Sequence, residues 1–424
     1  MEEDFLYHIW KYKLFSKLNL FTVNGAPIFI VKAGLENKNS GPDFLNSQLK
    51  IDNQIWVGNV EMHLKSSDWY LHKHEEDVNY DAVILHVVWE HDAVIFRKNN
   101  TEIPTLELKN IVDKTILNNY KKLVLSKQKW IPCENQISKT ETFLLNNWLE
   151  RLYFERLEQK SILIKELLEE SNFNFEAVLF QLLAKNFGLK VNGDAFLQLA
   201  KSIDFSIIRK VQFDKAQLSA LLFGQAGFLE DENEDFYYQE LKKEYQFLKH
   251  KYQLKSISKN MFQFFRMRPN NFPTIRIAQF VALYHNCQNL FSKLIVLKEK
   301  KEFYNLLSNE VDGFWKTHYT FETTSKKSAK KISKAFIDLL LINTIIPLKL
   351  IYLQNRGEAF EDDILQLIQQ VNTEKNSIIS NFSALKVKAN NAMESQALIQ
   401  LKNNYCTKKQ CLQCAIGNRL LKES

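Results

Sequence analysis

Glycine and proline are scarce in this chain, with 11 and 7 occurrences among 424 residues. So few turn-forming residues argue against collagen-like repeats, disorder and an all-β protein rich in turns. Hydrophobic residues make up 45% of the chain, which is ample material for a core. A chain of this length usually holds more than one domain. We therefore expect a folded protein of more than one domain.

The sequence also lacks the features of a membrane-spanning or exported protein. No apolar run is long enough to cross a bilayer, and the longest, residues 339–351, fits a buried helix. The first residues are acidic, which does not fit a signal peptide. Five cysteines, an odd number, fit a reducing compartment when no export signal is present. The expected location is the cytoplasm, with no membrane partner.

The hydrophobic pattern changes near Trp130. Before it, a helix over residues 4–15 precedes short strand-like runs, and beyond it nearly every segment has helical periodicity. The predicted fold class is α+β, an α/β domain with a mixed sheet followed by a mostly α-helical domain. The predicted strands are residues 28–31, 47–51, 55–64, 82–89, 93–97 and 105–108. The predicted divisions are an α/β domain (1–125), a linker (126–140), a helical domain (141–404) and a cysteine-bearing tail (405–424).

One predicted strand carries three ionisable residues on one side. Strand side chains alternate between faces, so Glu61, His63 and Lys65 share one face. The apolar residues between them share the other face, which fits a core. A hairpin with its turn at residues 52–53 would bring Asp43 back beside Glu61. Two carboxylates beside a basic residue suit a Mg²⁺ or Mn²⁺ site in a hydrolase. An amphipathic edge strand gives the same pattern, so this alternative stays open.

Histidines gather in the same region. Five of the nine lie within 29 residues: His63, His72, His74, His86 and His91. Together with the neighbouring acidic residues Asp68 and Asp77, they would suit zinc or another transition metal. The spacing matches no His-Glu-x-x-His motif. In a second interpretation, His72 and His74 contact phosphate or orient water beside the metal.

Ordered motifs in this region resemble a known family. "GPDF" (41–44) and "GNVEMHLKSSDWYLHKHEEDVNYDAVILHVVW" (58–89) are similar to the bacterial domain of unknown function 2851. The likeness extends through "RPNNFPTIRIAQ" (268–279) to "YCTKKQCLQCAIG" (405–417). This family name implies no activity.

The N-terminal part is also similar to the PD-(D/E)XK phosphodiesterase superfamily, which has Pro-Asp on one strand and acid-x-Lys on the next. Pro42-Asp43 and Glu61 match that pattern. The resemblance implies a nuclease-like α/β domain in which a metal is held by Asp43 and Glu61. His63 stands where the superfamily has lysine, and Lys65 follows two positions later. Either residue is therefore a candidate for polarising the attacking water, and a degenerate, inactive site is the alternative.

Three cysteines lie close together near the C-terminus, at Cys406, Cys411 and Cys414. Zinc and [4Fe–4S] clusters each take four ligands, and Cys133 could be the fourth. Some PD-(D/E)XK nucleases are similar, with one remote and three clustered cysteines around a cluster. Reduced, unligated thiols are the alternative. Cys287 fits an ordinary helix residue.

The expected function is metal-dependent phosphodiester cleavage, with nucleic acid as the partner. A net charge of +7 permits such a partner without requiring it. Asp43, Glu61, His63 and Lys65 are the candidate catalytic residues. The candidate substrate contacts are His72, Lys73, His74, Arg266, Arg268 and Arg276. Two alternatives remain: a non-catalytic nucleic-acid-binding or scaffold protein on a degenerate nuclease fold, and a zinc-dependent hydrolase that uses the histidines. The sequence does not distinguish DNA from RNA as the substrate, and it leaves protein partners unknown.

Overall fold

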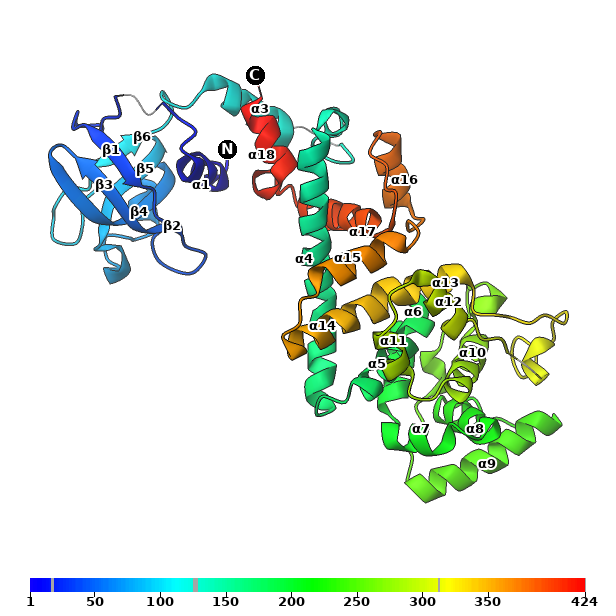
Figure 1. Cartoon of the computed structure of the whole chain (residues 1–424). Coiled ribbons are helices and arrows are strands. Elements are labelled where there is room, and N and C mark those ends of the chain that lie inside the picture. Colours follow the sequence, from blue (N-terminus) through cyan, green and yellow to red (C-terminus); the bar gives the residue numbers. More distant parts are fainter. Residues whose placement is uncertain (17–18, 125–128, 312, 424) are drawn as a thin grey trace. The chain divides into compact units, whose positions relative to one another are not determined.

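The computed structural model describes residues 1–16, 19–124, 129–311 and 313–423, and it confirms the α+β fold class (Figure 1). The chain forms two compact units. The first unit comprises residues 1–148 and 401–424, and the second comprises residues 149–400. The start of the predicted linker, residues 126–128, lies outside the described residues.

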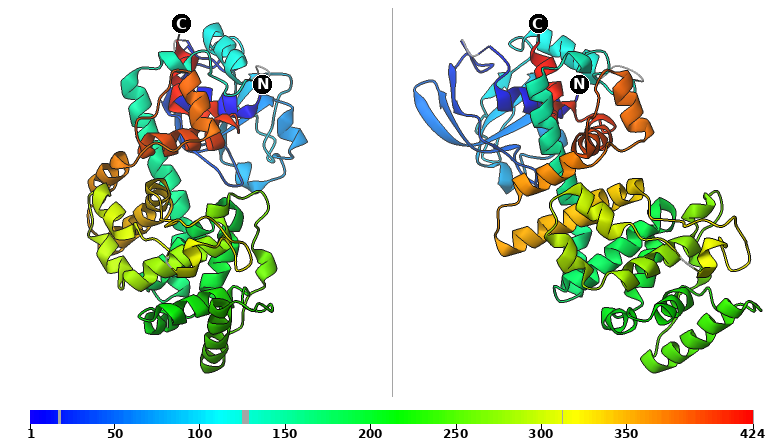
Figure 2. Two further views of the ribbon diagram at one scale, coloured as in Figure 1. Left: turned by 90° about the vertical axis from the view of Figure 1, so that its right-hand side faces the viewer. Right: turned by 45° about the vertical axis from the view of Figure 1, so that its right-hand side comes forward.

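A curled, mixed sheet forms the centre of the first unit (Figure 2). Among the described residues its strand order is β1-β3-β4-β5-β6, with the short β2 paired to β3. β3 runs antiparallel to both β1 and β4, whereas β4, β5 and β6 run parallel to one another. The strands are β1 Ile28–Lys32, β2 Leu35–Glu36, β3 Phe44–Ile51, β4 Gln54–Lys65, β5 Val83–Glu90 and β6 Thr105–Glu107.

The predicted hairpin between residues 47 and 64 is confirmed as β3 and β4. Asp52 lies in the turn at φ +52°, a left-handed conformation that aspartate tolerates better than most residues. The register pairs Phe44 with Val60. Asp43, which precedes β3, is therefore held beside Glu61 in β4.

The connection from β4 to β5 contains a short helix, α2 (Asp68–Leu71), and a 3₁₀ turn, η1 (Val78–Tyr80). Trp69 of this connection is buried against Val83, Ile95 and Ile103. This packing anchors the loop that carries His72 and His74.

The predicted strand over residues 93–97 is wrong. Within the described chain, only an isolated bridge joins Phe96 to Glu102. A tight turn at residues 99–100 separates them, and the Arg97 amide donates to the Thr101 carbonyl. The segment is therefore too short and too strongly turned to form a ladder with a neighbouring strand.

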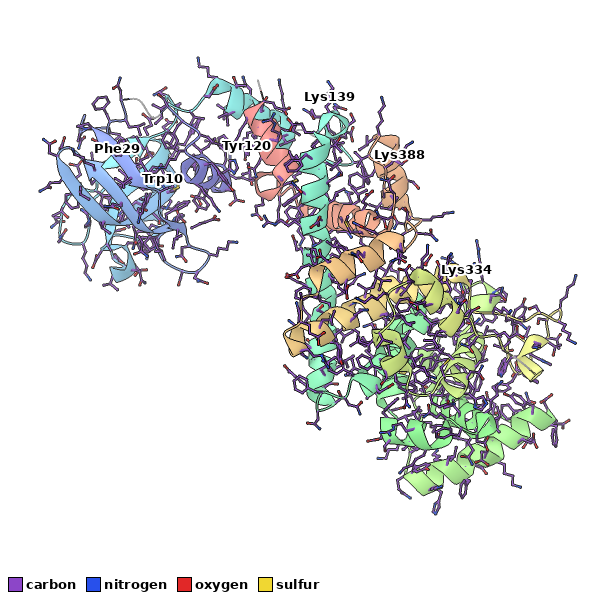
Figure 3. The ribbon with its side chains drawn as sticks, viewed as in Figure 1. Trp10, Phe29, Tyr120, Lys139, Lys334 and Lys388 are labelled. Carbon is purple, nitrogen blue, oxygen red and sulfur yellow. The ribbon has the colours of Figure 1, made fainter. Side chains whose placement is uncertain are left out.

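Helices from both ends of the chain complete the first unit: α1 (Glu3–Tyr12), α3 (Lys114–Val124) and α18 (Ala415–Lys422). α1 packs on β4, and α18 packs on α3. Trp10 of α1 is buried, and its indole N–H donates to the Ala33 carbonyl at 3.0 Å (Figure 3). The other described elements are η2 (Ile137–Lys139), η7 (Leu401–Cys406) and η8 (Cys411–Gln413).

The second unit is helical. α4 (Thr142–Glu170) begins in the first unit and continues into the second. The following helices are α5 Phe175–Phe187, α6 Leu189–Lys201, α7 Phe205–Val211, α8 Lys215–Gln225, α9 Phe236–Tyr252, α10 Pro273–Asn286, α11 Leu290–Ile295, α12 Lys300–Leu307, α13 Lys334–Leu340, α14 Ile346–Arg356, α15 Glu361–Gln370, α16 Ser377–Ala384 and α17 Ala392–Gln400. Short 3₁₀ turns are η3 Lys259–Met261, η4 Pro269–Asn271 and η5 Gly313–Lys316.

One continuous helical segment, Lys334–Arg356, is long and apolar enough to cross a membrane by composition. It consists of α13, the π-helical stretch η6 (Leu341–Ile345) and α14. Because 83% of its most apolar window is buried inside the protein, it has the character of a core helix. The predicted burial of residues 339–351 is confirmed at most of these positions.

Candidate metal centre

Two carboxylates lie side by side where β3 begins. The Asp43 backbone N–H donates to Oε2 of Glu61 at 3.1 Å, and the Met62 N–H donates to Oδ2 of Asp43 at 3.0 Å. The Tyr7 side chain, from α1, also hydrogen-bonds to Asp43. These bonds follow from the hairpin register, since each carboxylate is held by the backbone next to the other. The structure thus brings the two predicted magnesium ligands together.

Burial changes the ionisation of this pair. It raises the pKa of Asp43 well above the usual range, and the negative charge of Glu61 raises it further. Burial also raises the pKa of Glu61. Two buried like charges are unfavourable without a cation. The pair therefore retains a proton near neutral pH, and a bound cation would favour its release.

Three histidines converge on the same place. Nε2 of His63 lies 3.0 Å from Nδ1 of His72. One ring nitrogen from each of His63, His72 and His74 lies within 4.8 Å of the others. Oε1 of Glu61 is 3.4 Å from Nε2 of His74 and 3.6 Å from Nε2 of His63. We call Asp43, Glu61, His63, His72 and His74 the histidine–carboxylate cluster.

His63 is held in place from behind. Its Nδ1 lies 2.8 Å from Nε2 of His86, which is fully buried in β5. This contact fixes the ring orientation and leaves Nε2 of His63 facing the cluster, as outer-shell partners of metal ligands do. Burial lowers the pKa of His63, and it lowers that of His86 to about 3. Both rings are therefore neutral, which is the form that binds metals.

His74 is positioned by aromatic rings. Tyr80 stacks on it with centroids 3.8 Å apart, and Trp69 meets it edge-on at 5.4 Å. These two residues belong to the same connection as His74. The anchoring of Trp69 in the core therefore also determines where this imidazole lies.

The donor set has a definite chemical preference. Three imidazoles with a carboxylate suit Zn²⁺ and neighbouring transition metals, including Mn²⁺ and Fe²⁺, whereas Mg²⁺ prefers oxygen ligands. The residues present fit a transition metal better than magnesium, although Asp43 and Glu61 supply oxygens for either.

Several predicted residues lie outside the cluster. Lys65 is exposed at the end of β4, and Lys73 is exposed at φ +59°. Asp68 accepts from the Lys65 amide at 2.9 Å, and Asp77 accepts from the Asn79 amide at 2.9 Å. Both aspartates therefore stabilise local turns. His91 contacts Oγ of Ser66 at 2.8 Å.

β4 is covered on both of its faces near Glu61. Val60 and Met62 are buried as expected, but Glu61 and His63 are also buried. α1 packs on β4 and contributes Tyr7 to the site. The polar face of β4 is therefore covered at Glu61 and His63, whereas Lys65 is exposed at the end of the strand.

Two residues of α1 were missed from the sequence. Tyr7 contacts Asp43. Glu3 is half-buried and lies near enough to His72 and His74 to interact with them electrostatically. Burial raises the pKa of Glu3. Their spacing of four positions places them on one face of a helix, which is the signal that could have indicated them.

The three predicted arginine contacts lie in the second unit. The prediction for Arg276 is wrong, because its side chain is buried and already bonded. Its guanidinium donates to Gln279 at 2.9 Å and to Asn271 at 2.6 Å, and lies 3.8 Å from the ring centroid of Phe336. Arg266 and Arg268 are exposed, and their role as substrate contacts stays a prediction.

Comparisons with known proteins give a family without an activity. A family model described as a protein of unknown function, DUF2851, matches residues 3–377. No curated protein and no solved structure matches the chain. The similarity to PD-(D/E)XK enzymes consequently has no support from these comparisons, and the function must be argued from the side chains.

Zinc binding tests the cluster directly. We expect the purified chain to bind about one Zn²⁺ and His72→Ala to weaken binding by more than about 100-fold, since loss of an outer-shell partner alone costs about 10–100-fold. His86→Ala should fall within that outer-shell range. Isothermal titration calorimetry measures both. His91→Ala is the control and should bind like the wild type; equal affinities in all four proteins would contradict the cluster as a metal site.

The carboxylate pair predicts an unusual pH dependence of stability without metal. Burial raises the pKa of Glu61 to about 8 and that of Asp43 to about 7. The folded protein therefore keeps protons that the unfolded chain has lost, and the free energy of unfolding should fall as the pH rises to about 8. Neutral histidines such as His63 oppose this trend only below about pH 6.5, where unfolded histidine is protonated.

Thermal unfolding in a chelator, between about pH 6.5 and 8.5, measures this effect. The wild-type melting temperature should decrease across the range, and that of Glu61→Gln should decrease less. An equal decrease in both proteins would show that the pair does not hold the proton.

Proposed function

Because the chain belongs to the family described as protein of unknown function DUF2851, whose name specifies no activity, we propose a function from the histidine–carboxylate cluster. The protein is a metal-dependent phosphodiesterase that acts on nucleic acid. The observation that carries this proposal is the convergence of the buried Glu61 and the half-buried Asp43 with three histidines, beside β4. Buried groups with strongly shifted pKa values that meet at one point are typical of catalytic sites.

The residues have separate roles in this proposal. His63, His72, His74 and Glu61 hold the cation, and Asp43 completes the set from the start of β3. A bound divalent cation would lower the pKa of a water molecule and neutralise charge on a phosphate. His86 keeps His63 in the orientation that ligation requires.

Support for a phosphodiester substrate comes from charge and from a local resemblance. Pro42-Asp43 precedes β3 and Glu61 lies in β4, in the order that the PD-(D/E)XK superfamily shows. Lys65 and Lys73 are exposed at the end of β4 and in the following connection. Lysines in such positions can contact phosphate as point charges. The departure from the superfamily is that His63 occupies the lysine position and belongs to the histidine group.

A zinc-dependent hydrolase is the second candidate, and the histidine geometry favours it. Three imidazoles within 4.8 Å are not needed by a magnesium nuclease. The two candidates share the site but differ in the metal that supports turnover. The third alternative, a non-catalytic protein on the same fold, predicts binding of nucleic acid with no cleavage.

A cleavage assay tests the proposal. Wild type and Glu61→Ala are incubated with labelled single- and double-stranded DNA and RNA, with Mg²⁺, Mn²⁺ or Zn²⁺. The wild type should cleave at least one substrate, and Glu61→Ala should lose at least about 100-fold of that activity, since it removes a ligand and a buried charge. Glu90→Ala is the control, because this exposed carboxylate pairs with Lys109 away from the cluster. Equal cleavage by wild type and Glu61→Ala would refute the proposal.

Substitutions of His63 and of Lys65 should impair different properties of the protein, namely turnover and nucleic-acid binding. His63→Ala removes a buried ligand, so turnover should fall while nucleic-acid binding is retained. Lys65→Ala removes an exposed charge, so binding should weaken and the slope of log affinity against log salt should drop by about one. Fluorescence anisotropy and single-turnover rates separate the two effects. If Lys65→Ala instead lost turnover while His63→Ala kept most of it, Lys65 would have the role of the superfamily's lysine.

A further inference from the structure

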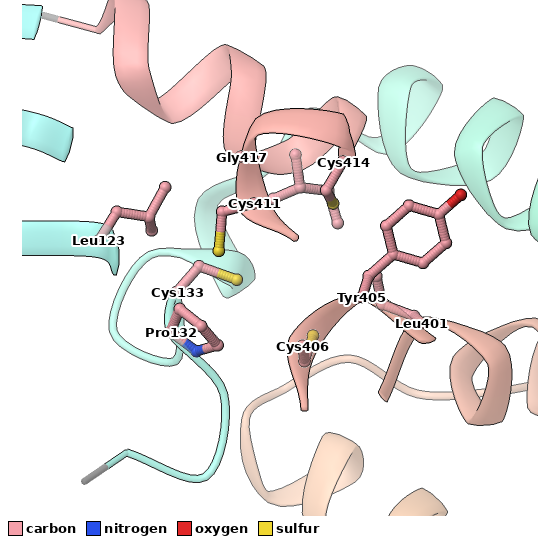
Figure 4. Close-up of a pocket in the computed structure, with 10 residues that line it drawn as sticks. Leu123, Pro132, Cys133, Leu401, Tyr405, Cys406, Cys411, Cys414 and Gly417 are labelled. Carbon is pink, nitrogen blue, oxygen red and sulfur yellow. The ribbon is translucent and has the colours of Figure 1, made fainter. Parts of the chain in front are cut away.

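Four of the five cysteines meet in the first unit, away from the histidine–carboxylate cluster in the sequence. Cys133 lies in the turn before η2, Cys406 ends η7, Cys411 begins η8, and Cys414 precedes α18. All four are buried, and none forms a disulfide. They line one cavity, and their sulfur atoms surround a common space (Figure 4). We call them the cysteine cluster.

The rest of the cavity wall is apolar. It includes Leu123, Pro132, Leu401 and Ile416. None of the residues that line this cavity carries a charged side chain that could stabilise a thiolate. A positively charged metal would supply the compensation that four thiolates in an apolar wall lack.

Cys414 lies at the start of a helix. It is the N-cap residue of α18, so its sulfur lies near the amides of Ile416 and Gly417. The indole of Trp148 lies close to the same sulfur. Donors at a helix N-terminus stabilise a thiolate, and hydrogen bonds to sulfur tune iron–sulfur clusters.

Gly417 makes the close approach of this turn feasible. A Cβ at position 417 would stand 2.1 Å from the carbonyl oxygen of Cys411, so any side chain would force the backbone apart. The glycine thus lets η8 fold against the first turn of α18. This close packing brings the Cys411 and Cys414 side chains to the same cavity.

The spacing of the sulfurs distinguishes between metals. Four thiolates at about 2.3 Å around one tetrahedral zinc would lie about 3.8 Å apart. Among the described residues, no three cysteine sulfurs lie within 4.8 Å of one another. The three histidine nitrogens of the histidine–carboxylate cluster do lie that close. Wider spacing suits a cluster in which each cysteine binds a separate iron.

We propose that Cys133, Cys406, Cys411 and Cys414 hold a [4Fe–4S] cluster that fastens the C-terminal segment to the rest of the first unit. The proposal is independent of the hydrolytic function, because no residue of the histidine–carboxylate cluster takes part. The cluster joins residues on either side of the second unit in the sequence. Its role here is structural, and no change of oxidation state is required.

The full chain, purified without oxygen, tests the proposal. It should be brown and contain about four iron and four acid-labile sulfide per chain, either as isolated or after incubation with ferrous iron and sulfide under reducing conditions. Cys133→Ser and Cys414→Ser should each lose most of this iron. Cys287→Ser is the matched control, because Cys287 is also buried but lies in the second unit, with its thiol 3.6 Å from the Leu306 carbonyl. This variant should keep the iron.

The wild-type measurement decides the question even if a serine variant fails to fold. A wild type that contains no iron or acid-labile sulfide after reconstitution would overturn the iron–sulfur assignment, whether or not it holds zinc, because the histidine–carboxylate cluster is itself expected to bind about one Zn²⁺. Equal iron in Cys133→Ser and the wild type would overturn the ligand set. Exposure of the wild type to air should bleach the colour and speed proteolysis of residues 401–424; unchanged proteolysis after bleaching would overturn the fastening role.

Discussion

The pairing of β3 with β4 is the constraint on which the candidate metal centre depends. Its register sets Asp43 against Glu61, with each carboxylate bonded to backbone beside the other. Two buried acids so close together destabilise a fold unless a proton or a cation separates their charges. The surrounding structure maintains this arrangement: α1 covers it, and the connection after β4 supplies two imidazoles. A cation bound between the two groups, as proposed here, would relieve this repulsion.

Much of this arrangement could be predicted from local patterns. The turn at residues 52–53 and the alternating strand that follows were enough to place Asp43 near Glu61. The convergence of the histidines was harder to foresee, because it depends on how the connection after β4 folds back. That path is determined by the burial of Trp69 and the left-handed turn at Lys73, which alternation alone does not show. The covering helix escaped notice for the same reason, since Tyr7 reaches the site only through tertiary packing.

The errors also have physical causes. The strand expected at residues 93–97 has the right residue types, but the tight turn after it leaves only a short pairing with residues 101–103, which forms an isolated bridge and not a strand. Arg276 was expected to contact the substrate. In the fold, it lies in α10 of the second unit and is buried, and its guanidinium is bonded to neighbouring amides. Charge in a sequence predicts contact with a ligand only when the side chain also reaches the surface.

The composition of the first unit has a consequence for how the protein is made. Residues 1–148 leave the ribosome early, but the unit also needs residues 401–424, which pack α18 onto α3. At about 5–20 residues per second, the whole second unit is synthesised in between, which takes tens of seconds. During that interval Cys133 lacks its three companions, and the surface of α3 that receives α18 stays uncovered. The first unit therefore stays incomplete, with part of its core exposed, until residues 401–424 have been synthesised.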